Sequence, residues 1–113
     1  MFKIELKGEV IDKIDNFIDS YLNSFLILFI DSWIEDVYLI EENYKKIATK
    51  FRDQIYFSLK DTCEKDIIFW KRIWDNGELS IIISVWNYKI FIDYRENNIS
   101  KIRYIENVEF YKK

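Results

Sequence analysis

In this 113-residue chain, the stretch from Asp66 to Tyr111 has a pattern typical of short strands joined by tight turns, so the fold must be built around a sheet. Asn76-Gly77 separates two segments rich in β-branched and aromatic residues, and Asn-Gly is a strong signal for a two-residue hairpin loop. Counting outward from that loop fixes the register of the two strands. The predicted pairs are Trp74 with Leu79, Arg72 with Ile81, Trp70 with Ile83 and Ile68 with Val85.

Two further turns extend the predicted sheet. A two-residue loop at Asn87-Tyr88 pairs Val85 with Ile90, Ile83 with Ile92 and Ile81 with Tyr94. A three-residue loop around Asn97-Asn98 then pairs Asp93 with Arg103. Val108–Tyr111 is expected to add a short last strand.

Because side chains alternate along a strand, this register predicts two unlike faces. The first face is apolar, is interrupted by Arg72, and is expected to receive the helices on Ile68, Trp70, Ile81, Ile83, Val85, Ile90 and Ile92. The second face mixes aromatic, aliphatic and basic side chains, namely Phe69, Trp86, Phe91, Ile105, Lys71, Lys89, Lys101 and Arg103.

The chain before Asp66 has helical spacing after an initial strand. Met1–Lys7 alternates apolar and charged residues, which predicts a half-buried strand at a sheet edge. From Glu9 the apolar residues recur with a helical period. The run Phe25–Ile30 is consistent with a buried strand or with the end of this helix, and the unbroken phase favours helix. The predicted fold is a single α+β domain over residues 1–113, with an N-terminal strand, two helices and an antiparallel meander of four or more strands.

The second helix is expected to begin at a capping box, Ser32-Trp-Ile-Glu35. In this motif the Ser32 hydroxyl accepts a hydrogen bond from the Glu35 backbone N–H, and the Glu35 carboxylate accepts one from the Ser32 backbone N–H. Its apolar spacing continues to Phe51 and can run on through Leu59. The alternative is a separate strand over Gln54–Leu59.

The composition argues against most catalytic classes. The chain has no histidine and one cysteine, so a zinc site of the usual kind cannot be built and Cys63 has no histidine to activate it. No phosphate-binding glycine loop or nucleophile elbow is present. The N-terminal segment lacks the apolar core of a signal peptide, and Phe25–Ile30 is too short to span a bilayer. We therefore expect a cytoplasmic protein that is not an enzyme and uses no cofactor or metal.

Charge is distributed unevenly along the chain. Residues 9–42 hold nine acidic residues and one basic residue, a net charge of −8, whereas the whole chain carries −3. Most charged runs simply keep a surface in water. The sharper interpretation is an acidic face that docks on a basic partner, such as the phosphate-binding cleft of a nuclease.

Four features give the chain a general profile: its small size, the acidic run Glu9–Glu42, an exposed aromatic such as Trp86, and the missing catalytic residues. In this profile it resembles the small acidic immunity proteins that bacteria pair with secreted toxins, of the bacteriocin or contact-dependent growth inhibition type. The resemblance implies a tight one-to-one complex with a cognate toxin, often a nuclease. The expected partner contacts are Asp12, Asp15, Asp19, Glu35, Asp36 and Trp86.

Three alternatives remain at the level of the sequence. A phage-encoded inhibitor of a host defence nuclease would use the same acidic surface. A homo-oligomer would use the mixed sheet face. A nucleic-acid-binding module would use the aromatic and basic side chains of that face, Trp86, Phe91, Lys89, Lys101 and Arg103.

Overall fold

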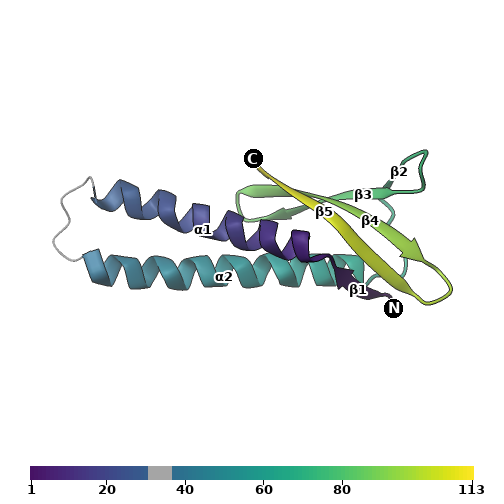
Figure 1. Ribbon diagram of the computed structural model, residues 1–113, viewed down its shortest axis with the longest axis horizontal. Coiled ribbons are helices and arrows are strands. Elements are labelled where there is room, and N and C mark those ends of the chain that lie inside the picture. Colours follow the sequence, from purple (N-terminus) through teal and green to yellow (C-terminus); the bar gives the residue numbers. More distant parts are fainter. Residues whose placement is uncertain (31–36) are drawn as a thin grey trace.

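The computed structural model describes the backbone of residues 1–30 and 37–113 and the side chains of residues 1–24 and 42–113. Within these residues, two helices form an antiparallel hairpin against one face of a five-stranded sheet (Figure 1). The molecule is elongated, 58 × 23 × 23 Å, because the helical hairpin extends well beyond one end of the sheet. The expected α+β class is therefore confirmed.

The sheet is mixed, whereas a purely antiparallel meander was predicted. Its strands are β1 (Lys3–Leu6), β2 (Arg72–Ile73), β3 (Leu79–Val85), β4 (Tyr88–Asn97) and β5 (Ile102–Lys112). Their order is β1-β5-β4-β3-β2, with β1 parallel to β5 and the other neighbours antiparallel. The N-terminal strand lies at an edge, as expected. It pairs in parallel with β5, which the long connection through the helices and the meander permits.

The helices are α1 (Gly8–Ile30) and α2 (Val37–Cys63). Phe25–Ile30 belongs to α1, so the helical interpretation of that run is confirmed. The alternative strand over Gln54–Leu59 is wrong, because α2 continues without a break to Cys63. The capping box at Ser32–Glu35 lies outside the described backbone.

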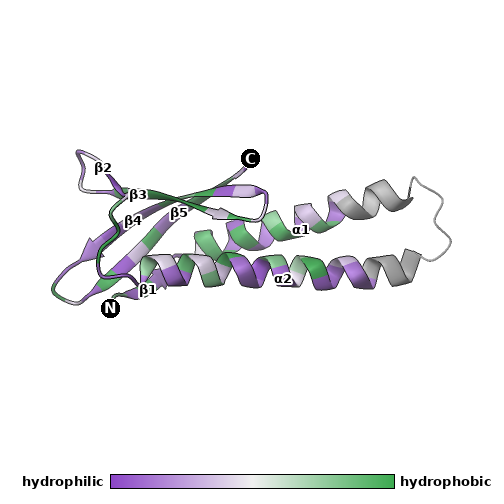
Figure 2. Ribbon diagram, turned by 180° about the vertical axis from the view of Figure 1, so that it is seen from behind, coloured by the Kyte–Doolittle hydropathy of each residue, from purple (hydrophilic) through white to green (hydrophobic). Residues whose placement is uncertain are grey.

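The core lies between the helices and the sheet. Ile14 of α1 and Phe51 of α2 are fully buried in one cluster that also contains Ile90 and Ile92 of β4. Each such side chain contributes roughly 1.5–3 kcal/mol by leaving water. Coloured by hydropathy, the described parts of both helices in Figure 2 alternate between hydrophobic and hydrophilic segments, as expected of helices with one buried side. The predicted apolar face is confirmed at Ile81, Ile83, Val85, Ile90 and Ile92, and Ile68 is buried beside the sheet.

The first hairpin has a longer loop than predicted. Trp74 N–H donates to the Glu78 carbonyl and Gly77 N–H to the Trp74 carbonyl, so the loop is Asp75-Asn76-Gly77. Only the glycine takes a positive φ, +83°. Arg72 therefore pairs with Ser80, one residue away from the predicted register. A slip of one residue reverses the faces, so Trp70, Arg72 and Trp74 leave the predicted core side.

The second hairpin differs by two residues and keeps its faces. Its loop is Trp86-Asn87, with Trp86 at φ 53°, and Val85 pairs with Tyr88 where Ile90 was predicted. A slip of two residues preserves the alternation of inward and outward side chains. The apolar face of β3 and β4 consequently remains the core face.

The third connection corrects the register of the last strand. Its loop is Asn98–Lys101, and Arg103 lies opposite Glu96, not opposite Asp93. This odd slip turns Arg103 and Ile105 from the predicted mixed face into the core, where they are 1% and 0% exposed. A bulge at Asp93/Tyr94 then shifts the register by one more residue, so the later residues of β5 alternate between the two faces as predicted. The residues predicted as a separate last strand continue β5 to Lys112.

Candidate functional site

The exposed side of α1 carries three aligned carboxylates. Asp12, Asp15 and Asp19 are all exposed, and their spacing of three and four residues places them on one side of the helix. Ile14 and Ile18 anchor the opposite side in the core. These three aspartates form what we call the acidic stripe, and the packing of α1 holds it on the outer surface of the molecule.

The acidic stripe is not neutralised in place. Among the described residues, none of its carboxylates forms an ion pair. Lys13, the one base of α1, instead reaches β5, where its Nζ lies 2.8 Å from Glu109 Oε1 and 2.7 Å from Asn107 Oδ1. Hydrogen bonds from Lys13 and Asn107 lower the pKa of Glu109. The one base of α1 is therefore engaged on the sheet side. On the α2 side, the charges of Asp15 and Arg52 act in opposite directions on the pKa of Tyr56, so this arginine lies near the stripe, but it pairs with Asp53.

Of the other predicted contacts, Trp86 can be placed, and it packs on α2 and not beside the stripe on α1. Glu35 and Asp36 lie outside the described residues. Trp86 is 41% exposed in the β3–β4 loop, and its ring stacks on Phe51 of α2 with centroids 4.6 Å apart. It therefore borders the core, since Phe51 is fully buried.

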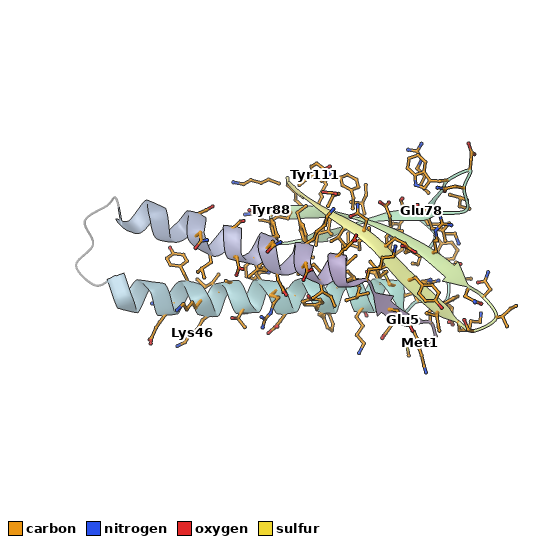
Figure 3. The ribbon with its side chains drawn as sticks, viewed as in Figure 1. Met1, Glu5, Lys46, Glu78, Tyr88 and Tyr111 are labelled. Atoms are coloured by element: carbon orange, nitrogen blue, oxygen red, sulfur yellow. The ribbon has the colours of Figure 1, made fainter. Side chains whose placement is uncertain are left out.

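The exposed side of α2 has the opposite charge character. Lys45, Lys46 and Lys50, with Thr49 and Asp53, line a shallow groove on this helix. Lys46 points away from α1 and from the sheet (Figure 3). Negative and positive helical surfaces are thus carried by different helices, so the acidic character belongs to α1 and not to the whole described helical layer.

The uncovered face of the sheet holds a groove that the sequence did not predict. Trp70, Arg72, Trp74, Ile82 and Phe91 line an open depression of ≈ 430 Å³, with Ser80 and Asp93 at its polar wall. The Arg72 guanidinium lies 3.9 Å from the centre of the Trp74 ring. Hydrogen bonds fix the tryptophan, since its Nε1 donates to Ser80 Oγ at 2.6 Å, and that hydroxyl donates to Asp93 Oδ1 at 2.5 Å. The interruption of the apolar pattern at Lys71 and Arg72 is the only sequence signal for this surface.

The residues proposed for nucleic-acid binding are not brought together. Phe91 and Lys89 are exposed on the uncovered face, but Trp86 packs on α2 and Arg103 is buried. The Arg103 guanidinium donates to the carbonyl of Cys63 at 2.6 Å, to that of Asp66 at 3.2 Å, and to that of Lys65. Its Nε also donates to Glu96 Oε1 at 2.9 Å. The role of Arg103 is therefore structural.

Cys63 is placed as an inert thiol. It is fully buried, and burial raises its pKa to about 12. A thiol with such a pKa is protonated at neutral pH and is a poor nucleophile. In the part of the chain that is described, no group of three or more His, Cys, Asp or Glu side chains is arranged to hold a metal ion.

Comparison with known proteins adds no relative: no protein-family model, no curated protein and no solved structure matches this chain. Neither α1 nor α2, over its described residues, has a segment long and apolar enough to cross a membrane.

Proposed function

We propose that this chain is a binding protein without catalytic activity that neutralises a basic protein partner through the acidic stripe. In this role it acts as an immunity protein against a bacterial toxin, with a nuclease as the favoured class of target. The observation that carries the proposal is the alignment of Asp12, Asp15 and Asp19 on the exposed side of a helix whose only base is engaged elsewhere.

The stripe has dimensions that suit a phosphate-binding cleft. A helical rise of about 1.5 Å per residue spreads the three carboxylates over roughly 10 Å. Three successive phosphates of one DNA strand spread over about 7 Å along the helix axis. The stripe therefore presents negative charge on a length scale that a nuclease cleft already recognises, and it does so from a rigid helix that cannot be cut.

Electrostatic attraction also explains how such a partner would be selected. A patch of one sign accelerates the encounter with a surface of opposite sign and repels surfaces of like sign. Because the stripe is exposed, salt screens it, with a Debye length of about 10 Å at 0.1 M ionic strength. The complex should therefore form fastest at low ionic strength.

The test compares two variants that change the net charge equally. In D12K/D15K/D19K the stripe is reversed, whereas in E42K/D53K/D61K three exposed acids of α2 are reversed. Each protein is used as bait in extracts of the native host, and any captured protein is identified and assayed for nuclease activity. We expect wild type and the α2 variant to capture and inhibit a basic nuclease, and the stripe variant to lose both properties.

Two results would overturn the proposal. One is undiminished capture and inhibition by D12K/D15K/D19K. The other is a captured partner without a basic surface. The identity of an inhibited nuclease also distinguishes two functions. A secreted toxin would indicate a bacterial immunity protein, and a host defence enzyme would indicate a phage-encoded inhibitor.

A further inference from the structure

The outer edge of β3 is open over most of its length. β4 pairs with β3 from Leu79 to Val85, but on the other side β2 pairs only with Leu79 and Ser80. The connection from α2 to β2 lies toward the end of the sheet where β3 begins (Figure 1), and its Trp70 lines the groove together with Ile81 and Ile82 without pairing with them as a strand. The segment Ile81–Val85 is therefore a sheet edge without a neighbouring strand in the described chain.

The first hairpin determines which backbone groups of this edge point outward. Trp74 N–H donates to the Glu78 carbonyl at 2.9 Å, so Glu78 faces β2. Hydrogen-bonding direction alternates along an antiparallel strand. Ser80 consequently faces Arg72, and Ile82 and Ser84 direct their N–H and C=O groups outward. Among the described residues these groups have no hydrogen-bond partner.

The edge also lacks the features that prevent strands from pairing between molecules. Exposed edges are commonly protected by charged side chains, proline or bulges. The opposite edge of this sheet follows that rule, because β1 exposes Lys3 and Glu5. In contrast, β3 has the sequence LSIIISV, without charge, proline or a bulge.

We propose that a second copy of this chain pairs with the β3 edge in antiparallel orientation about a two-fold axis at Ile83. In this register Ile82 lies opposite Ser84 of the other copy, and Ser84 lies opposite its Ile82. Each pair brings together two residues whose backbone groups point outward, so every open group of Ile82 and Ser84 gains a partner.

The same register suits the side chains. Ile81, Ile83 and Val85 of both copies fall on the helix-covered side of the sheet, where they continue the apolar layer. Ile82 and Ser84 fall on the uncovered side, where Ile82 lines the groove, and no like charges meet along the pairing. A strand from an unrelated partner would satisfy the backbone equally well, but only a second copy matches this edge residue for residue in a closed arrangement.

This inference does not rest on the proposed function. The acidic stripe lies on α1, which packs under β5, whereas β3 lies over α2. Reversal of the stripe should therefore leave the dimer intact, and loss of the dimer should leave capture of a basic partner intact.

Sedimentation velocity over a range of protein concentrations tests the proposal. We expect wild type to shift reversibly from monomer to dimer. Proline at position 84 removes only an N–H that is unpaired in the monomer, and edge strands tolerate such a change. S84P should remain monomeric at all concentrations with the circular dichroism of the folded protein, whereas the control S84A, which keeps the N–H, should dimerise.

A disulfide experiment tests the register. Directly opposed residues in a hydrogen-bonded antiparallel pair have Cα atoms about 5.5 Å apart, within disulfide range. I82C and S84C proteins, mixed and oxidised, should form a covalent heterodimer, while each alone should form much less. A monomer at every concentration, a dimer that survives S84P, or equal cross-linking of all combinations would overturn the proposal.

Discussion

Arg103 is the residue that ties the sheet to the helices. Its guanidinium joins β5 to Glu96 of β4 and to three backbone carbonyls at and beyond the end of α2. It also stacks at 3.8 Å on the ring of Phe2, which is itself buried. These carbonyls follow the last turn of a helix and would otherwise lack donors. One charged side chain thus closes the core where the end of α2, the start of β5 and the residue before β1 meet.

Replacement of Arg103 should be among the most destabilising single changes. We expect Arg103→Met to lower the free energy of unfolding by about 3 kcal/mol, because it leaves Glu96 and buried carbonyls without a partner. Arg103→Lys should recover only part, since an ammonium cannot reproduce the planar fork. The control Arg95→Met, at an exposed arginine, should change little in urea titrations. Equal effects at the two positions would contradict this role.

Tyr94 carries a polar group that the core does not satisfy. Its side chain is fully buried, and its hydroxyl finds no hydrogen-bond partner among the described residues. A buried unpaired hydroxyl is costly, so Tyr94→Phe should raise the free energy of unfolding by about 1 kcal/mol. Denaturant unfolding at neutral pH provides the measurement, and a clear loss of stability would show that the hydroxyl is paired.

Two buried groups, the Cys63 thiol and the Tyr94 hydroxyl, predict that the fold loses stability in alkali. Burial raises the pKa of Cys63 and that of Tyr94 to about 12, above the values of these groups in an unfolded chain, about 8.5 and 10. Above those values the unfolded chain releases protons that the folded chain retains, so stability falls with rising pH until about pH 12. Between about pH 8 and about pH 10, the range in which an exposed thiol ionises, the free energy of unfolding of Cys63→Ala should decline less than that of wild type in denaturant titrations. Identical declines would contradict the burial of the thiol.

At the scale of elements, loop length decides which side chains face the core. Asn76-Gly77 correctly predicts a turn, but the dipeptide does not distinguish a two-residue loop from a three-residue loop with glycine alone at positive φ. That difference moved Trp70, Arg72 and Trp74 to the uncovered face and created the groove. The slip in the next hairpin was even, so its apolar face was predicted correctly despite the wrong partners.

Gly77 should be sensitive to substitution for a conformational reason alone. A Cβ at this position meets no atom within 4 Å, but φ is +83°. Gly77→Ala should therefore cost about 1–2 kcal/mol. Gly8→Ala is the matched control, because the space is also open and φ is not positive, and it should be neutral or stabilising by up to about 1 kcal/mol. Thermal or urea unfolding of both variants tests the contrast, which equal effects would contradict.

The placement of Arg103 shows what hydrophobic patterning does not reveal. Periodicity assigns a charged residue to a solvent face, and here it assigned Arg103 to the mixed face. Its acceptors lie at Cys63, Lys65 and Asp66, far away in sequence, and only the assembled fold brings them to the guanidinium. The acidic stripe, by contrast, depends on helical spacing within one element, and it was predictable in full at Asp12, Asp15 and Asp19.

At the scale of the whole molecule, the helical hairpin covers one face of the sheet and separates the remaining surfaces. The acidic stripe lies on α1, the basic groove on α2, the aromatic groove on the uncovered face and the open edge on β3. Figure 3 shows Tyr88 and Tyr111 near the end of the sheet that lies over the helices and Glu78 beside the β2–β3 loop, toward the other end. Distinct surfaces allow one chain to bind a partner and a second copy without competition.

Whether the acidic stripe binds a basic partner is tested by the association rate constant with the captured partner, measured as a function of ionic strength. For wild type and for E42K/D53K/D61K, we predict fast association at low salt that slows steeply as salt screens the stripe. For D12K/D15K/D19K, we predict slow association at low salt with little or reversed salt dependence. Rates and salt dependences that are the same for all three proteins would show that the acidic stripe does not drive the association.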